Sequence, residues 1–157
     1  VMMSRVQKGL AGGVAGTVAV SLLELPNIFL NWFDPTPAVI AHVIGMDGNM
    51  AVGWALHLAI GVLLRGPAFG SLCPRLPTDT PETKGIAFAV GAFVLMMLVV
   101  FMFGDQSTFT SGAGFGAVAW MLITNVVFGI VMGNVYGRLI QRDRQRARAM
   151  SGMAAAH

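Results

Sequence analysis

Long apolar runs separated by short polar connections dominate the chain. Four such runs lie near residues 9–33, 50–72, 85–103 and 113–140. A helix needs roughly 17–25 apolar residues to cross the hydrocarbon core of a bilayer. Since the runs are apolar all round rather than on one face, they are unlike the surface helices of soluble proteins. The pattern predicts an all-α, integral membrane, antiparallel four-helix bundle, a single transmembrane domain over residues 1–157 with a basic tail at 141–157.

The connections predict one further helix and one irregular helix. Thr36 followed by Pro37 is a helix-start signal, and the apolar segment 38–44 after it is too short to span a membrane. We expect a short helix there, at the membrane interface. Pro67 falls inside the second run, so we expect that span to continue to about residue 72 with a kink at the proline.

Composition agrees with a membrane protein. Hydrophobic residues make up 55% of the chain, charged residues 11%, and the mean hydropathy is +0.72, whereas soluble domains carry roughly 25% charged residues. Cys73 is the single cysteine, which excludes an intrachain disulfide and a cysteine-based metal site. The sequence contains no nucleotide-binding glycine motif, HExxH, CxxC or nucleophile elbow. We therefore do not expect an enzyme.

The basic residues have a one-sided distribution. They lie at the N-terminal end, in or beside the second connection, and at the C-terminal end: Arg5, Lys8, Arg65, Arg75, Lys84, Arg138, Arg142, Arg144, Arg146 and Arg148. The first and third connections contain only acidic charges. The positive-inside rule then places both termini in the cytoplasm of a bacterial inner membrane. A helical tail running along anionic lipid headgroups accounts for its arginines, so no nucleic acid partner is expected.

Three polar residues inside the spans are the candidate site residues: Glu24, His57 and Asn125. Ionisable groups within a membrane are costly and commonly functional. From their depths, we expect Glu24 and His57 to approach each other directly or through one water. A structural clasp is the favoured interpretation, and a proton-accepting or ligand site is the alternative. For Asn125, an interhelical hydrogen bond is favoured.

Rows of small residues at four-residue spacing predict where helices meet. Small side chains allow two backbones to approach closely in lipid. The glycines expected to face other helices are Gly9, Gly13, Gly53, Gly61, Gly129, Gly133 and Gly137.

Several motifs together resemble an uncharacterised family of small bacterial membrane proteins with four spans. They are the glycine-rich start KGLAGGVAGTVAVSLL, the WxxH of Trp54 and His57, KGIAF with the pair Met96–Met97, the turn at 112–116 and the ending FGIVMGNVYG. The resemblance implies a four-helix membrane fold and no particular activity. It also implies a histidine near position 125, where this chain has Asn125, so a two-histidine site would be incomplete here.

Three functions are compatible with these patterns. We favour an accessory or scaffolding subunit that packs, with membrane lipids, against other subunits of a respiratory or photosynthetic complex. One alternative is a b-type cytochrome with His57 as axial haem ligand, the one cofactor considered. Another is a small proton or solute transporter working through Glu24 and His57, which would require a homo-oligomer.

Overall fold

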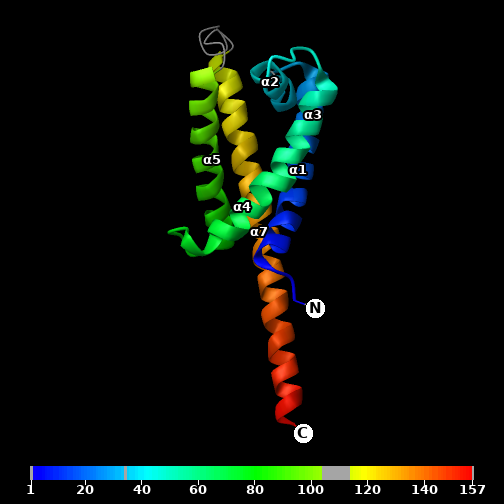
Figure 1. Ribbon diagram of the computed structural model, residues 1–157, viewed down its shortest axis with the longest axis vertical. Helices are drawn as coiled ribbons and strands as arrows, with labels where there is room; N and C mark the ends of the chain where they lie inside the picture. The colour runs from blue at the N-terminus through cyan, green and yellow to red at the C-terminus, as the bar shows by residue number, and fades with distance from the viewer. Residues whose placement is uncertain (1, 34, 104–113, 157) are drawn as a thin grey trace.

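The secondary structure of the described residues is helical throughout. The computed structural model describes residues 2–33, 35–103 and 114–156 (Figure 1). Its elements are α1 (Arg5–Leu30), α2 (Thr36–Val43), α3 (Met50–Ala59), the π-helix η1 (Ile60–Arg65), α4 (Gly66–Leu72), the 3₁₀ turn η2 (Cys73–Arg75), α5 (Pro81–Phe103) and α7 (Gly114–Ala155). The expected all-α class is confirmed in this part of the chain.

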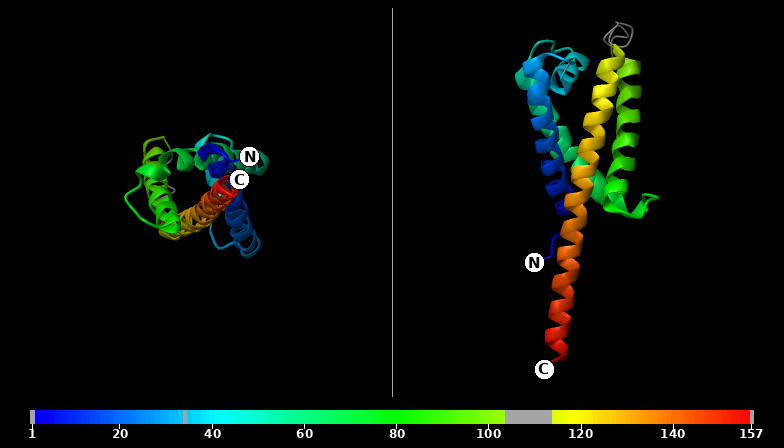
Figure 2. Two further views of the ribbon diagram at one scale, coloured as in Figure 1. Left: turned by 90° about the horizontal axis from the view of Figure 1, so that it is seen from below. Right: turned by 180° about the vertical axis from the view of Figure 1, so that it is seen from behind.

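Four helical stretches are long and apolar enough to cross a membrane. They are α1, the continuous stretch Met50–Arg75, α5, and α7 from Val118 onward. Figures 1 and 2 show α7 in the middle, with α5 along one side and α1 along the other, and α1 also packs on η1 and α4. The expectation of a multi-pass membrane protein is supported.

The helix ends differ from those expected. The first helix begins at Arg5, because Ser4 and Gln7 form a reciprocal capping box. It ends at Leu30, where Asn31 adopts a left-handed conformation with φ of 53°. The last helix continues well beyond residue 140. Its 42 residues correspond to about 63 Å, twice the thickness of a hydrocarbon core, so the tail continues α7 in a straight line (Figure 1).

The second span is irregular just before its proline. Residues 60–65 form a π-helix, and Pro67 is accommodated at the first turn of α4, where a missing N–H is tolerated. From there α4 runs toward the start of α5 (Figure 1). The expected short helix is present as α2, whose Pro37 carbonyl lies directly against Gly53 of α3.

Glycines allow the spans to touch backbone to backbone. Gly9 lies against Gly66 and Gly70, and Gly13 against Gly61 and Gly66. On the other side of the molecule, Gly129 and Gly133 lie against Gly85, while Gly133 and Gly137 also meet Pro81. A Cβ at most of these glycines would overlap a backbone oxygen or carbon of the neighbouring helix. All seven glycines expected to face other helices therefore meet protein in this structure.

A small core joins α1, the second span and α7 toward the end of the molecule that carries most of the basic residues, the basic end. Val20, Phe69, Cys73, Phe128, Met132 and Tyr136 are buried together there. The ring of Phe69 makes edge-to-face contacts with Tyr136 and with Phe88 of α5, at centroid distances of 5.3 and 5.5 Å. These aromatic contacts link α5 to the rest of the core.

The close approach of α5 and α7 predicts opposite effects of Gly→Ala at two sites. An added methyl at Gly129 would meet the Gly85 backbone and, at 2.7 Å, the Ala89 Cβ, whereas Gly91 on α5 has open space. We expect Gly129→Ala to destabilise the protein by about 1–3 kcal/mol. Gly91→Ala should be neutral or stabilise by up to about 1 kcal/mol. Thermal unfolding in detergent measures both, and equal effects would contradict the packing.

Candidate functional site

Glu24 is the centre of a buried hydrogen-bond network. Its Oε1 accepts from the Thr36 hydroxyl at 2.8 Å, from the Thr36 backbone N–H at 3.3 Å and from the Trp120 indole N–H at 3.3 Å. Its Oε2 accepts from the Asn27 amide at 3.1 Å. The carboxyl is fully buried. Donors from α1, α2 and α7 therefore converge on one side chain.

Asn27 extends this network to the end of α1. Its amide also donates to the Phe33 carbonyl at 3.0 Å, and its carbonyl oxygen accepts from the Phe33 N–H at 2.9 Å. The Phe33 ring in turn stacks on Trp120, with centroids 5.7 Å apart. Glu24 and Asn27 together therefore fix the connection between α1 and α2 against α7. We refer to Glu24, Asn27, Thr36 and Trp120 as the Glu24 clasp.

The packing of α1 on α7 brings Trp120 to Glu24. Gly12 lies against Met132 and Gly16 against Phe128. Two further turns along each helix, the same register pairs Glu24 with Trp120. The glycine contacts near the basic end thus determine which α7 residue meets the carboxyl at the other end.

His57 and Glu24 do not bind each other. The carboxyl oxygens of Glu24 bind the clasp donors, and the Nε2 atom of His57 is buried without a hydrogen-bond partner among the described residues. The expected direct contact is therefore not formed, and a contact through water stays a prediction. The packing of α1 explains why Glu24 and His57 lie at different levels. Thr17 meets Gly61, which is one turn from His57, whereas Glu24 lies about two turns beyond Thr17.

The π-helix aligns Arg65 with His57. In a regular α-helix two residues eight positions apart are rotated by about 80° from each other. The extra residue accommodated by η1 reduces that rotation to about 20°. Because helical side chains lean toward the N-terminal end of their helix, the Arg65 side chain extends toward His57. Its guanidinium lies over the Phe128 ring, 4.1 Å from the centroid.

Several polar atoms of this region are buried without a hydrogen-bond partner in the described part of the chain. They are Thr17 Oγ1, Ser21 Oγ, His57 Nε2, and Arg65 Nε and Nη2. All belong to α1, α3 or η1. The Phe128 ring offsets part of the cost of the buried guanidinium. Among the described residues, no carboxylate forms an ion pair with it.

Asn125 satisfies its amide within its own helix. Its Nδ2 donates to the Met121 carbonyl at 2.7 Å. The acceptor lies four positions earlier in the same helix, so the amide N–H has a partner without a residue from another helix. The expected interhelical hydrogen bond is therefore replaced by an intrahelical one, although the residue is buried as expected.

The structure gives haem no room on the glycine face beside His57. Gly53 is covered by the Pro37 carbonyl and Gly61 by the Thr17 side chain. The ring of Trp54 also lies edge-on to His57, with centroids 5.5 Å apart. The space that these two glycines leave beside His57 is therefore filled by α1 and α2. In the described residues, no group of three or more His, Cys, Asp or Glu is arranged to hold a metal ion.

The sequence indicates the buried carboxyl of Glu24 but not its partners. Thr36 carries a helix-start signal, and nothing in the sequence marks Trp120 as a hydrogen-bond donor to residue 24. Arg65 lies beside the second connection, and the π-helix that turns it inward has no clear sequence signal. The nearest available hint was the four-residue row of Gly53, His57, Gly61 and Arg65.

The fold and the clasp define an α-helical protein with four candidate membrane spans, held by glycine contacts and by the buried carboxyl of Glu24. Residues 3–147 match a family of unknown function, DUF6789, and the chain belongs to that family. Searches among curated proteins and among solved structures found no match.

The Thr36 hydroxyl tests the contribution of the clasp. Thr36→Val removes a donor to a buried carboxylate, so we expect a loss of about 1–3 kcal/mol in the free energy of unfolding. Thr36→Ser keeps the hydroxyl and should stay close to wild type. Reversible unfolding in mixed micelles, followed by helical circular dichroism, measures both. Equal stability of the two variants would show that the hydroxyl does not stabilise Glu24.

Proposed function

We propose that this protein is an accessory or scaffolding subunit of a larger membrane complex, of the respiratory or photosynthetic kind. It would be an antiparallel four-helix membrane bundle that offers α5 to a partner. The observation that carries this proposal is the incomplete packing of α5. Within the described residues, its one extensive helix contact is with α7, and the outer half of the second span does not pack on it.

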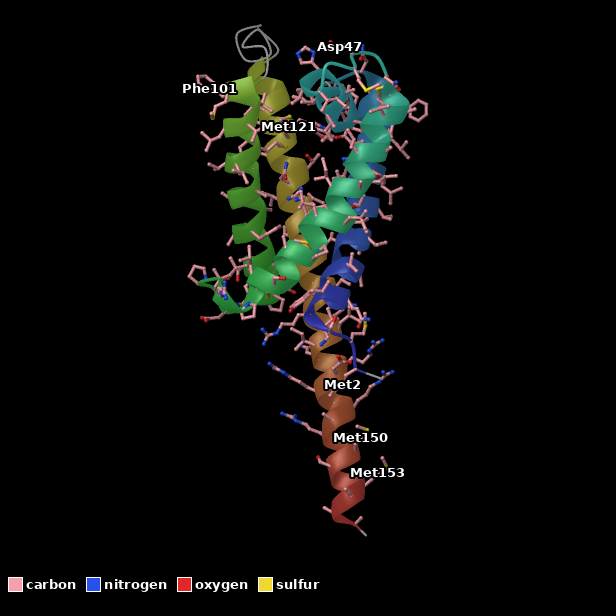
Figure 3. All side chains as sticks on the ribbon, in the orientation of Figure 1. Met2, Asp47, Phe101, Met121, Met150 and Met153 are labelled. Atoms are coloured by element: carbon pink, nitrogen blue, oxygen red, sulfur yellow. The ribbon has the colours of Figure 1, made fainter. Side chains whose placement is uncertain are left out.

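The free face of α5 is apolar and has a shallow hollow between its own side chains. Phe93, Val94, Met97, Leu98 and Phe101 line a hollow of about 310 Å³. Leu98 and Phe101 are 54% and 61% exposed, and Figure 3 places Phe101 on the side of α5 away from α1. A ridge of side chains from another helix fits such a groove. Methionine adapts readily to a partner surface.

The polar interior supports a structural role over a transport role. A proton carrier at Glu24 would need free access to its oxygens, yet each of them accepts hydrogen bonds from protein donors. The unpartnered atoms of His57 and Arg65 are the feature that favours the transporter alternative. Neither residue hydrogen-bonds to the Glu24 clasp in the described part of the chain, so we rank transport second.

Site-specific photocrosslinking tests the α5 face. A photoreactive amino acid at Leu98 should give a discrete protein adduct in native membranes, because this position would lie against the partner. The matched control is Leu22 on α1, which is 61% exposed and does not line the hollow on α5. It should give mainly lipid adducts. The same protein adducts from both positions, or none from Leu98, would contradict the proposed partner face.

The proposal includes an orientation with both termini in the cytoplasm. The N-terminal end, the connection before α5 and the extension of α7 lie toward one end of the molecule, and α2 lies at the other (Figures 1 and 2). The basic residues other than Arg65 belong to the first end, while Asp47 lies beside α2, where it pairs with His42 at 2.5 Å. This separation supports the positive-inside orientation.

Cysteine labelling tests the orientation in a Cys73→Ser background. Asp47→Cys should react with a membrane-impermeant maleimide in intact cells, since it lies at the exposed outer connection. Arg148→Cys should react only after the membrane is permeabilised. Both positions are exposed in the structure, so accessibility alone should not separate them. The reverse labelling pattern would overturn the orientation.

A further inference from the structure

A second hollow lies at the basic end of the molecule, away from the Glu24 clasp. It has a volume of about 500 Å³ and is enclosed by the start of α1, the turn η2, the start of α5 and the extension of α7. Its size falls within the roughly 300–1,000 Å³ of sites that hold small molecules. Figures 1 and 2 show these four segments near one another at the level where the tail of α7 leaves the bundle. We refer to this hollow as the basic pocket.

Cations from three helices line the basic pocket. Arg5 and Lys8 come from α1, Lys84 from α5 and Arg144 from α7, and Asp143 is the one acidic residue among the lining residues. Four cations and one carboxylate leave an excess of three positive charges. Such a concentration of charge in a partly enclosed hollow attracts an anion.

Two of the four cations are already engaged by the protein. Lys8 forms an ion pair with Asp143 at 2.8 Å. The Lys84 ammonium donates to the carbonyls of Cys73 and Leu76, each at 3.0 Å, which ties the turn η2 to α5. An ammonium has three donors, so Lys84 retains one for another acceptor. These two lysines therefore hold the walls of the pocket in place.

The two arginines are the free donors. Neither Arg5 nor Arg144 has a side-chain hydrogen bond or an ion pair with any other residue that the structure describes. Both side chains are exposed, so the arginines are available to a ligand. A guanidinium presents a planar set of donors that matches the oxygens of a phosphate.

The level of the pocket indicates what kind of phosphate it meets. The second span ends at η2, α5 begins at Pro81, and the apolar part of α7 ends near Ile140, which also lines the pocket. These helices therefore change from apolar to charged surface at this level. Phe88 and Leu76 lie against the adjoining core and continue the apolar surface beside it. A ligand that carries a phosphate and hydrocarbon chains would therefore place its phosphate against the charged surface and its chains against the apolar surface.

We propose that the basic pocket binds the phosphate of an anionic phospholipid, with Arg5 and Arg144 as its principal donors and Lys84 as a third. The acyl chains then run along the apolar surfaces of α5 and α7. Basic pockets between membrane helices on the cytoplasmic side recognise lipid headgroups by the same chemistry. This site is independent of the α5 face and of any partner that binds there.

Lipid titration of the purified, delipidated protein tests the site. Native mass spectrometry in detergent would compare phosphatidylglycerol with the zwitterionic phosphatidylcholine, and inorganic phosphate would be added as a competitor in a separate arm. We expect selective binding of phosphatidylglycerol by the wild-type protein. The double variant Arg5→Gln/Arg144→Gln should bind phosphatidylglycerol at least about tenfold more weakly, since two charge-assisted hydrogen bonds are lost.

The matched control removes the same charge outside the pocket. Arg146→Gln/Arg148→Gln lies on the same α7 extension, but neither residue lines the pocket, so it should keep near wild-type affinity. If both double variants lost affinity for phosphatidylglycerol equally, the effect would come from general positive charge, and the proposed binding site in the basic pocket would be overturned. Equal binding of the two lipids, or displacement of the lipid by inorganic phosphate at equal concentration, would overturn the assignment to a lipid-borne phosphate. The four arginines are exposed, and a thermal unfolding curve for each variant verifies its folding.

Discussion

Direct contact between helix backbones at glycine is the constraint on which the rest of the structure depends. Lipid removes most of the hydrophobic drive for helices to associate, so close packing has to supply it. Gly9 and Gly13 bring α1 onto the second span, and Gly85 and Gly129 bring α5 onto α7. Both pairs of helices therefore pack through backbone contact at glycines. Side chains larger than hydrogen at these points would separate the axes and weaken contacts along whole helices.

The Glu24 clasp depends on that packing and strengthens it. A buried carboxyl is costly unless donors satisfy it, and here four donor groups on three residues do so. Those donors come together only when α1 lies in one register on α7, the register that Gly12 and Gly16 allow. The clasp thus selects one alignment among several that small residues alone would permit. A single polar residue can specify register in this way even where it adds little stability.

The sequence was sufficient for the four spans and the short helix near residues 36–44, because apolar length and a Thr-Pro start are local signals. It also identified the glycine faces, since spacing at four residues is visible in one dimension. It was not sufficient for the partners of Glu24, because Thr36 and Trp120 reach it only after three elements have packed. The π-helix at 60–65 was missed for a related reason. An inserted residue is stabilised by the packing of Gly61 on Thr17 and of Arg65 on Phe128, and neither contact can be read locally.

The two ends of the molecule are built differently, and the difference follows from where packing and charge lie. At the basic end, α1, the second span and α7 share the core around Phe69 and Met132. Lys8 joins α1 to Asp143 of α7, and Lys84 of α5 joins the turn η2. At the other end α2 covers α3 and the Glu24 clasp holds α1 to α7, but nothing among the described residues joins α5 extensively to the second span. A helix pair fixed at one end and free along one face keeps a defined shape while leaving apolar surface available. This combination suits a subunit whose packing is completed by another membrane protein. The polar groups of the Glu24 clasp are then internal, while the free face of α5 is apolar.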